Sequence, residues 1–204
     1  MIVIIDAGMG NLGSIFNMLR KVGANSRVSD KVEDILTADK LILPGVGHFD
    51  YGMNSLEERG HIQVLNQKVL EEKCPVLGIC LGMQLMTRRS EEGKRQGLGW
   101  IQADTKRFSF TATDSKLKIP HMGWNSIDTV KGASLFEPLR GNPRFYFVHS
   151  YYVVPDNDND IAARTSYGGE FCSAIQHDNM YGTQFHPEKS HKFGIAVMDA
   201  FSKL

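Results

Sequence analysis

A short apolar run passes into a turn of small residues and then into a helical pattern. Residues 76–79 are followed by Cys80, and Gly78 and Gly82 flank this cysteine at two residues' distance on either side. Flanking glycines let a strand bend sharply into a helix and expose the side chain between them. A thiolate in that place is favoured by the dipole of the following helix. The pattern predicts an α/β domain with Cys80 at a nucleophile elbow.

A second segment, Gln184-Phe-His186-Pro-Glu188-Lys-Ser190, follows another apolar run much later in the chain. Residues i and i+2 of an extended segment point to the same side, so Glu188 can orient the ring of His186. Together with Cys80 they supply a nucleophile, a base and an orienting carboxylate, which is the set needed for acyl transfer through a thioester. A single cysteine or histidine is usually structural, but the joint pattern favours a catalytic triad.

The composition fits one domain spanning residues 1–204. The chain has 204 residues, 42% of them hydrophobic, and a formal net charge of zero. Balanced charge predicts neither a nucleic-acid partner nor an anionic membrane surface. Residues 1–6 read as a first strand rather than a signal peptide, and no apolar run reaches membrane-spanning length, so we expect a cytoplasmic protein. Cys74 and Cys172 read as small buried hydrophobic residues, and we expect no metal and no cofactor.

Strand-like and helical patterns alternate in the first half of the chain. The expected strands are 2–6, 27–29, 41–43 and 76–79, with a helix over 11–22 and further helices between the later strands. The second half reads as strands 99–108, 121–127, 145–154, 161–165, 170–176 and 180–184, followed by a closing helix over 191–201. This order predicts a three-layer α/β fold with a mixed, mainly parallel sheet.

The elbow and the His-x-Glu segment resemble the class I glutamine amidotransferases. Within that family, four further segments look like the glutaminase subunits of imidazole glycerol phosphate synthases: Met9-Gly-Asn11, Pro44-Gly-Val-Gly47, Pro120-His-Met-Gly-Trp-Asn125 and Phe147-Val-His-Ser-Tyr151. The resemblance covers essentially the whole chain. It implies hydrolysis of L-glutamine and a heterodimer with a (β/α)8-barrel cyclase subunit, which takes the ammonia for imidazole ring formation in histidine biosynthesis.

The resemblance also implies roles for individual residues. The catalytic residues would be Cys80, His186 and Glu188, with oxyanion N–H donors near Val46, Gly47 and Leu81. Gln84 would hold the glutamine side chain, Glu92 its α-ammonium group, and the backbone around Ser150 and Tyr151 its carboxylate. The partner subunit would contact Asn11, His121, Met122, Trp124, Asn125 and Tyr146.

Two segments imitate ligand motifs. Residues 8–13 match the dinucleotide fingerprint Gly-x-Gly-x-x-Gly after a strand, but the same glycines open the family's sequences, so we interpret them as a tight turn and expect no NAD. Residues 156–160 alternate Asp and Asn like a calcium loop, yet the required glycine and final glutamate are replaced, which predicts a solvated turn.

Two positions depart from the family pattern. Ala7 replaces the usual aromatic residue, a change that bears on contacts with the partner. His48 stands where a small residue is usual, and we interpret it as a surface or helix-cap histidine without a chemical role.

Other functions stay open on the sequence. Glutaminases much like this chain also supply ammonia for nucleotide-sugar amidation in surface-polysaccharide synthesis. A cysteine peptidase or γ-glutamyl hydrolase would need an open groove, and the chain has no obvious insertion to build one. An inactive regulatory subunit would be expected to lack a catalytic residue, whereas all three are present.

Overall fold

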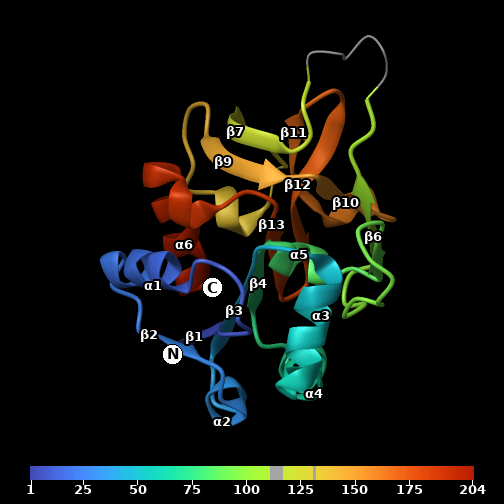
Figure 1. Ribbon diagram of the computed structural model, residues 1–204. Helices are drawn as coiled ribbons and strands as arrows, with labels where there is room; N and C mark the ends of the chain where they lie inside the picture. The colour runs from blue at the N-terminus through green and yellow to red at the C-terminus, as the bar shows by residue number, and fades with distance from the viewer. Residues whose placement is uncertain (111–116, 131) are drawn as a thin grey trace.

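The computed structural model describes residues 1–110, 117–130 and 132–204, and one large sheet forms its centre (Figure 1). In spatial order its strands are β2 (Ser26–Ser29), β1 (Ile2–Ile5), β3 (Lys40–Gly45), β4 (Val76–Cys80), β13 (Met180–Thr183), β12 (Glu170–His177), β10 (Tyr151–Pro155), β6 (Ala103–Arg107) and β5 (Arg89–Ser90), with β11 (Ile161–Ser166) beside β12 and β8 (Asp128–Thr129) beside β11. Strands β2 to β13 run parallel, and the neighbours from β13 to β6 are antiparallel. The predicted mixed sheet is confirmed.

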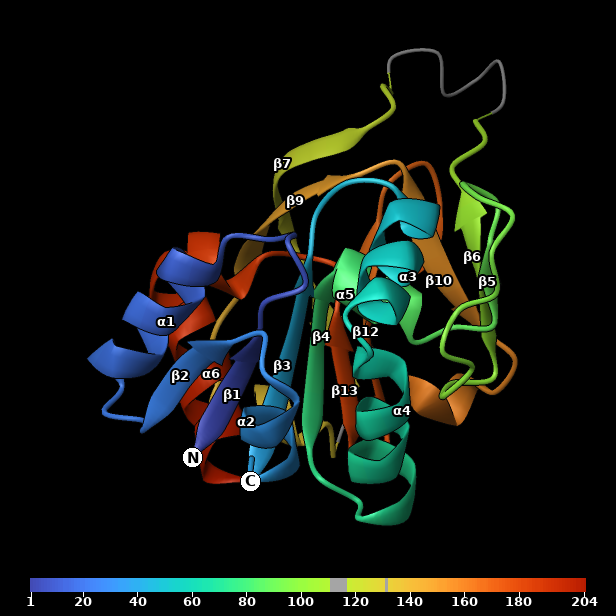
Figure 2. The ribbon, with the colours of Figure 1, turned by 60° about the horizontal axis from the view of Figure 1, so that its bottom comes forward.

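Alternating side chains divide the apolar core between the two faces of this sheet. On β1, Val3 and Ile5 pack into one core cluster, whereas Ile2 and Ile4 pack into the other. The first cluster includes side chains of α2 (Val32–Leu36), α3 (Phe49–Glu58) and α4 (His61–Asn66), and the second includes those of α1 (Leu12–Lys21) and α6 (His191–Lys203). Figure 2 shows the two helical groups on opposite sides of the strands. The three-layer architecture follows from this alternation.

The helices expected over 11–22 and 191–201 are present as α1 and α6. The described residues also form four short helical turns: the π-helical turn η1 (Gln67–Glu71) and the 3₁₀ turns η3 (Ser134–Phe136), η4 (Asp158–Asp160) and η5 (Pro187–Lys189). Within the described ranges, none of the helices combines the length and the apolar character needed to span a membrane.

A smaller sheet of two antiparallel strands, β7 (His121–Ser126) and β9 (Arg144–His149), packs beside the main sheet. The single strand predicted over 145–154 is therefore wrong, because the chain bends at Ser150 and β9 and β10 join different sheets. The strand predicted over 99–108 is also shorter, since β6 covers only Ala103–Arg107.

The elbow joins β4 to the short helix α5 (Leu81–Leu85). Cys80 has φ 55° and ψ −109°, a conformation that is strained for a residue with a side chain. Two glycines let α5 pack tightly against the sheet. A Cβ on Gly82 would lie 1.8 Å from the carbonyl oxygen of Leu43, and one on Gly78 would lie 2.7 Å from the backbone nitrogen of Met83.

We expect Gly82→Ala to lower the free energy of unfolding by about 3 kcal/mol, because its methyl group would collide with the backbone of β3. Gly13→Ala is the matched control. Gly13 lies in α1 with no atom within 4 Å of its added Cβ, so this change should stabilise the protein by about 0.5–1 kcal/mol. Denaturant unfolding measures both, and equal stabilities would contradict this account of the elbow.

Candidate active site

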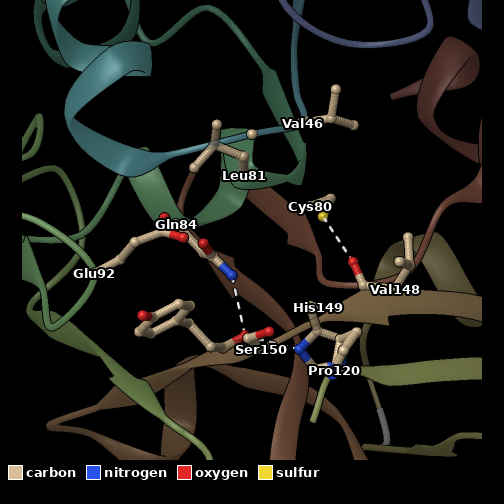
Figure 3. A pocket seen from close by; sticks show the side chains of 11 residues that line it. Val46, Cys80, Leu81, Gln84, Glu92, Pro120, Val148, His149 and Ser150 are labelled. Atoms are coloured by element: carbon tan, nitrogen blue, oxygen red, sulfur yellow. Dashed lines mark hydrogen bonds between the residues drawn. The ribbon is translucent and has the colours of Figure 1, made fainter.

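A cavity of about 310 Å³ opens beside the carboxyl ends of β3 and β4 (Figure 3). This edge of a parallel sheet is where ligands of α/β proteins bind. The residues that line the cavity are Val46, Gly47, Cys80, Leu81, Gln84, Glu92, Pro120, Val148, His149, Ser150 and Tyr151. The predicted nucleophile, oxyanion and substrate-binding residues are thus brought together in one place.

The thiol of Cys80 faces the carbonyl oxygen of Val148 at 4.0 Å, as the dashed line in Figure 3 shows. Its second neighbour is the side-chain nitrogen of Gln184, at 3.7 Å. The predicted base stands close by, since β13 runs beside β4 and ends shortly before His186.

The imidazole of His186 is 1% exposed and donates from Nδ1 to Glu188 Oε1 over 2.7 Å. Its Nε2 is buried and makes no hydrogen bond to the described residues. Burial lowers the pKa of His186, but the nearby charge of Cys80 and the hydrogen bond and charge of Glu188 outweigh burial and raise this pKa to about 10. The ring is therefore cationic at neutral pH, and an imidazolium is the state that donates a proton to a leaving group.

Strand β9 fixes the backbone of the histidine segment. The N–H of His186 donates to the carbonyl of Tyr146 over 2.9 Å. The hydroxyl of Ser190 donates to the carbonyl of His186 over 2.6 Å and accepts from the N–H of Tyr146 over 3.0 Å. Any movement of β9 is therefore transmitted through these hydrogen bonds to the backbone of His186.

Gln84 is oriented by its two amide hydrogens. Its Nε2 donates to the carbonyl of Tyr151 over 3.1 Å and to Gln184 Oε1 over 3.0 Å, which leaves Oε1 available to a ligand. Glu92 also lines the cavity, with Oε2 accepting from the N–H of Phe49 over 2.8 Å. An anchored carboxylate in a cavity is suited to binding an ammonium group.

His149 also belongs to the site, although its motif, Phe147-Val-His-Ser-Tyr151, predicted no role for it. It lines the cavity and donates from Nδ1 to the carbonyl of Tyr151 over 2.7 Å. Burial lowers its pKa to about 3, so the ring is neutral. No local sequence pattern identifies His149, because its place in the cavity depends on the bend at Ser150 that follows β9.

The residues predicted to contact a partner differ in exposure. Met122 is 61% and Trp124 41% exposed, and Trp124 stacks on His191 with ring centroids 5.2 Å apart. Tyr146 lies edge-on to Trp124 with its centroid 6.2 Å away. The interface prediction does not fit the side chain of His121, which is 3% exposed because it packs inward against the end of β9.

Two further residues predicted to contact the partner, Asn11 and Asn125, also make hydrogen bonds within the chain. Asn11 is exposed and caps α1, accepting from the N–H of Ser14 over 3.4 Å. Asn125 is half-buried and donates from Nδ2 to the carbonyl of Ser166 over 3.0 Å.

The structure also locates the departures from the family pattern. Ala7 is 1% exposed and its carbonyl accepts from the hydroxyl of Ser55 over 2.5 Å, so its side chain is in the core and not on a partner surface. His48 is confirmed as a helix cap, since its Nδ1 accepts from the N–H of Asp50 over 3.1 Å at the start of α3.

Local packing and ion pairing account for the two segments that imitate ligand motifs, residues 8–13 and 156–160. In the glycine-rich turn, Gly10 has φ 98° and a Cβ there would lie 2.9 Å from Pro44 Cβ. In the acidic turn, the carboxylate of Asp156 pairs with Arg88 over 2.7 Å and that of Asp160 with His177 over 2.8 Å.

Comparison with known proteins agrees with this geometry. The family model for the class I glutamine amidotransferases matches residues 3–201. The chain belongs to this family. The chain is 54% identical over 203 residues to an imidazole glycerol phosphate synthase subunit HisH 2 of Methanococcus maripaludis, covering 100% of this chain and 99% of that protein. It is 48% identical to the subunit HisH 2 of Pseudomonas aeruginosa and 44% identical to the subunit HisH of Leptospira interrogans, each over 204 residues and 100% of both chains.

Solved structures of lower sequence identity share the fold. A glutamine amidotransferase crystal structure matches with a TM-score of 0.76 at 16% identity, covering 100% of this chain and 99% of the other. The PurLQS structure from Thermotoga maritima matches with a TM-score of 0.71 at 19% identity, covering 98% and 95%. These neighbours support the predicted fold class.

We expect a glutamine-mimicking electrophile to label Cys80 alone. Burial raises the pKa of the Cys74 thiol and raises that of Cys172 to about 12, so neither supplies a thiolate at neutral pH. Intact-mass spectrometry should show one label per chain, lost in Cys80→Ser and retained when Cys74 and Cys172 are both changed to serine. A label on either of these two would contradict the elbow assignment.

Proposed function

We propose that Cys80, His186 and Glu188 hydrolyse L-glutamine to glutamate and ammonia, and that the ammonia passes to the cyclase subunit of an imidazole glycerol phosphate synthase. The observation that carries the proposal is the buried His186–Glu188 pair, 2.7 Å between Nδ1 and Oε1, beside a strained elbow thiol in the cavity. The similarity to imidazole glycerol phosphate synthase subunits supports the pathway, which is histidine biosynthesis. The three free thiols suit a cytoplasmic location for the proposed heterodimer, because the cytoplasm keeps thiols reduced.

In the first half of the reaction the Cys80 thiolate attacks the side-chain carbonyl carbon of glutamine. The oxygen becomes an oxyanion, for which the N–H of Leu81 and a peptide N–H near Val46 and Gly47 are the donors. Nε2 of His186 then gives its proton to the amide nitrogen. The carbon–nitrogen bond breaks, ammonia leaves, and a γ-glutamyl thioester remains on Cys80.

In the second half, water attacks the thioester carbon while the now neutral His186 takes a proton from it. The carbon–sulfur bond breaks, and glutamate and the Cys80 thiolate are released. Glu188 holds the ring in one tautomer and stabilises its cationic form, as the orienting carboxylate of a triad does. The sum is glutamine and water to glutamate and ammonia.

The amino-acid end of the substrate has matching groups across the cavity. Glu92 supplies one carboxylate for the α-ammonium group, and the backbone of Ser150 and Tyr151 supplies polar groups for the α-carboxylate. Because both amide hydrogens of Gln84 are engaged, its Oε1 is the atom that accepts a hydrogen bond from the substrate.

An exposed apolar surface marks the side on which we place the cyclase. Met122 and Trp124 of β7 are 61% and 41% exposed, and aromatic residues and methionine are enriched at protein interfaces. Trp124 and Tyr146 are direct cross-strand partners, and the carbonyl of Tyr146 holds the backbone of His186. Docking on this surface would therefore reach the catalytic base through one strand.

We expect Trp124→Ala to weaken binding of the cyclase at least about tenfold, the effect of losing a central aromatic contact. The activation of glutaminase turnover by the cyclase with bound acceptor should fall with it. Leu70→Ala is the matched control, since Leu70 is also 41% exposed but lies in η1, away from this surface. Calorimetric titration measures the affinity, and unchanged binding by Trp124→Ala would remove this residue from the interface.

The decisive test separates ammonia production from ammonia use. Cys80→Ala should abolish glutamine-dependent synthesis by the complex, because the nucleophile is gone. The same complex supplied with ammonium salt at high pH should still form product, because the acceptor chemistry lies in the partner. His186→Ala should behave likewise, and Glu188→Gln should lose less activity because a neutral amide still orients the ring.

Running the assay with the imidazole glycerol phosphate precursor and with a nucleotide-sugar acceptor tests the pathway. The second acceptor is included because Ala7 and residues 189–194 of the sequence leave the nucleotide-sugar pathway open. Product with only the nucleotide sugar would overturn the histidine pathway but not the glutaminase. Loss of ammonium-dependent synthesis in an assembled Cys80→Ala complex would mean that this chain does more than supply ammonia.

A further inference from the structure

Two buried histidines connect the exposed strand β7 with the cavity. His121 opens β7 and His149 closes β9, and the two are direct cross-strand partners. Nδ1 of His121 and Nε2 of His149 are 2.9 Å apart. His121 is 3% and His149 6% exposed, so water does not compete for this hydrogen bond.

The partners at each end determine which nitrogens carry the protons. The carbonyl of Tyr151 only accepts, so Nδ1 of His149 is the donor in their 2.7 Å contact. Burial lowers the pKa of His121 to about 4 and that of His149 to about 3, and both rings are neutral. Nε2 of His149 therefore accepts from Nδ1 of His121, and Nε2 of His121 accepts from Nδ2 of Asn125 at 3.3 Å.

The same carbonyl extends the chain of hydrogen bonds into the substrate site. Tyr151 accepts from His149 and also from Nε2 of Gln84 over 3.1 Å. Gln84 donates to Gln184, whose own Nε2 lies 3.7 Å from Cys80 Sγ. One polar chain thus runs from Asn125 in β7 to the nucleophile.

We propose that His121 and His149 are positioning residues that hold the carbonyl of Tyr151, and through it the amide of Gln84, in the orientation that binds glutamine. The inference rests on the proposed function, because it names how that substrate site is oriented. Neither ring transfers a proton in the reaction. Their contribution is the direction in which each hydrogen bond points, set from strand β7.

A purely structural alternative exists for His121, since its ring stacks on Tyr167 at 4.0 Å and on Phe147 at 4.7 Å between centroids. Substitutions can separate the two roles. Phenylalanine keeps an aromatic ring for stacking but removes the donor to His149. Asparagine removes the ring but places an amide N–H near the position of Nδ1. Stacking predicts that phenylalanine is tolerated better, and positioning predicts the reverse.

The experiment measures L-glutamine binding by calorimetry in the full chain carrying Cys80→Ala, so that no turnover occurs. We expect His121→Phe to raise the Kd for glutamine about tenfold, because a buried acceptor on His149 loses its partner. His121→Asn should stay within about threefold of the parent even though it lowers the unfolding temperature more. His149→Gln, which moves the donor away from Tyr151, should raise the Kd about as much as His121→Phe.

Tyr167→Phe is the matched control. It keeps the stacking on His121 and removes the hydroxyl that donates to the carbonyl of Lys118 over 2.7 Å. This hydroxyl lies outside the chain of hydrogen bonds from Asn125 to Cys80, so glutamine binding should not change. If the Cys80→Ala parent does not bind glutamine, the proposed function is wrong. If the parent binds and both His121→Phe and His149→Gln bind equally well, only the positioning role is wrong. Weaker binding by His121→Asn than by His121→Phe would also overturn it, in favour of stacking.

Discussion

The close approach of α5 to the central sheet is the constraint on which the rest of the site depends. Gly82 lets this helix pack directly against the backbone of β3, with no room for a side chain. That packing holds Cys80 at φ 55°, a conformation costing on the order of 1–3 kcal/mol that persists only where the surroundings fix it. The thiol is thereby placed at the carboxyl edge of the sheet, beside the strand that leads to His186.

The small sheet of β7 and β9 is the second organising element, because it takes part in both halves of the site. The backbone of Tyr146 in β9 holds the segment of His186, and His149 at the end of the same strand holds the carbonyl of Tyr151 in the cavity. Its partner strand exposes Trp124 to solvent. A displacement of this sheet would move both the backbone of His186 and the carbonyl of Tyr151 in the cavity, which gives a physical basis for the control by a docked subunit proposed above.

The sequence was sufficient for those features that local patterns encode. Glycines around Cys80 predicted the elbow, and strand–helix alternation predicted the layers. The break at Ser150 could not be predicted in the same way. Phe145 and Phe147 before it and Val153 after it are all buried, so the alternation of buried residues continues in phase through the bend. Only the pairing of β9 with β7 and of β10 with β6 shows that two sheets are involved.

The pair of His121 and His149 was equally beyond sequence reasoning, because it depends on the register that brings together two residues 28 positions apart in the sequence. Its contrast with His186 shows how neighbours decide the state of a buried ring. His186 has the carboxylate of Glu188 as partner and is held cationic. Burial lowers the pKa of His121 and His149, which have no carboxylate partner, and the charge of His186 lowers the pKa of His149 further. Of the three rings, only His186 is therefore cationic and carries a proton to donate. In the proposed roles, the neutral pair of His121 and His149 orients the substrate site without competing for that proton.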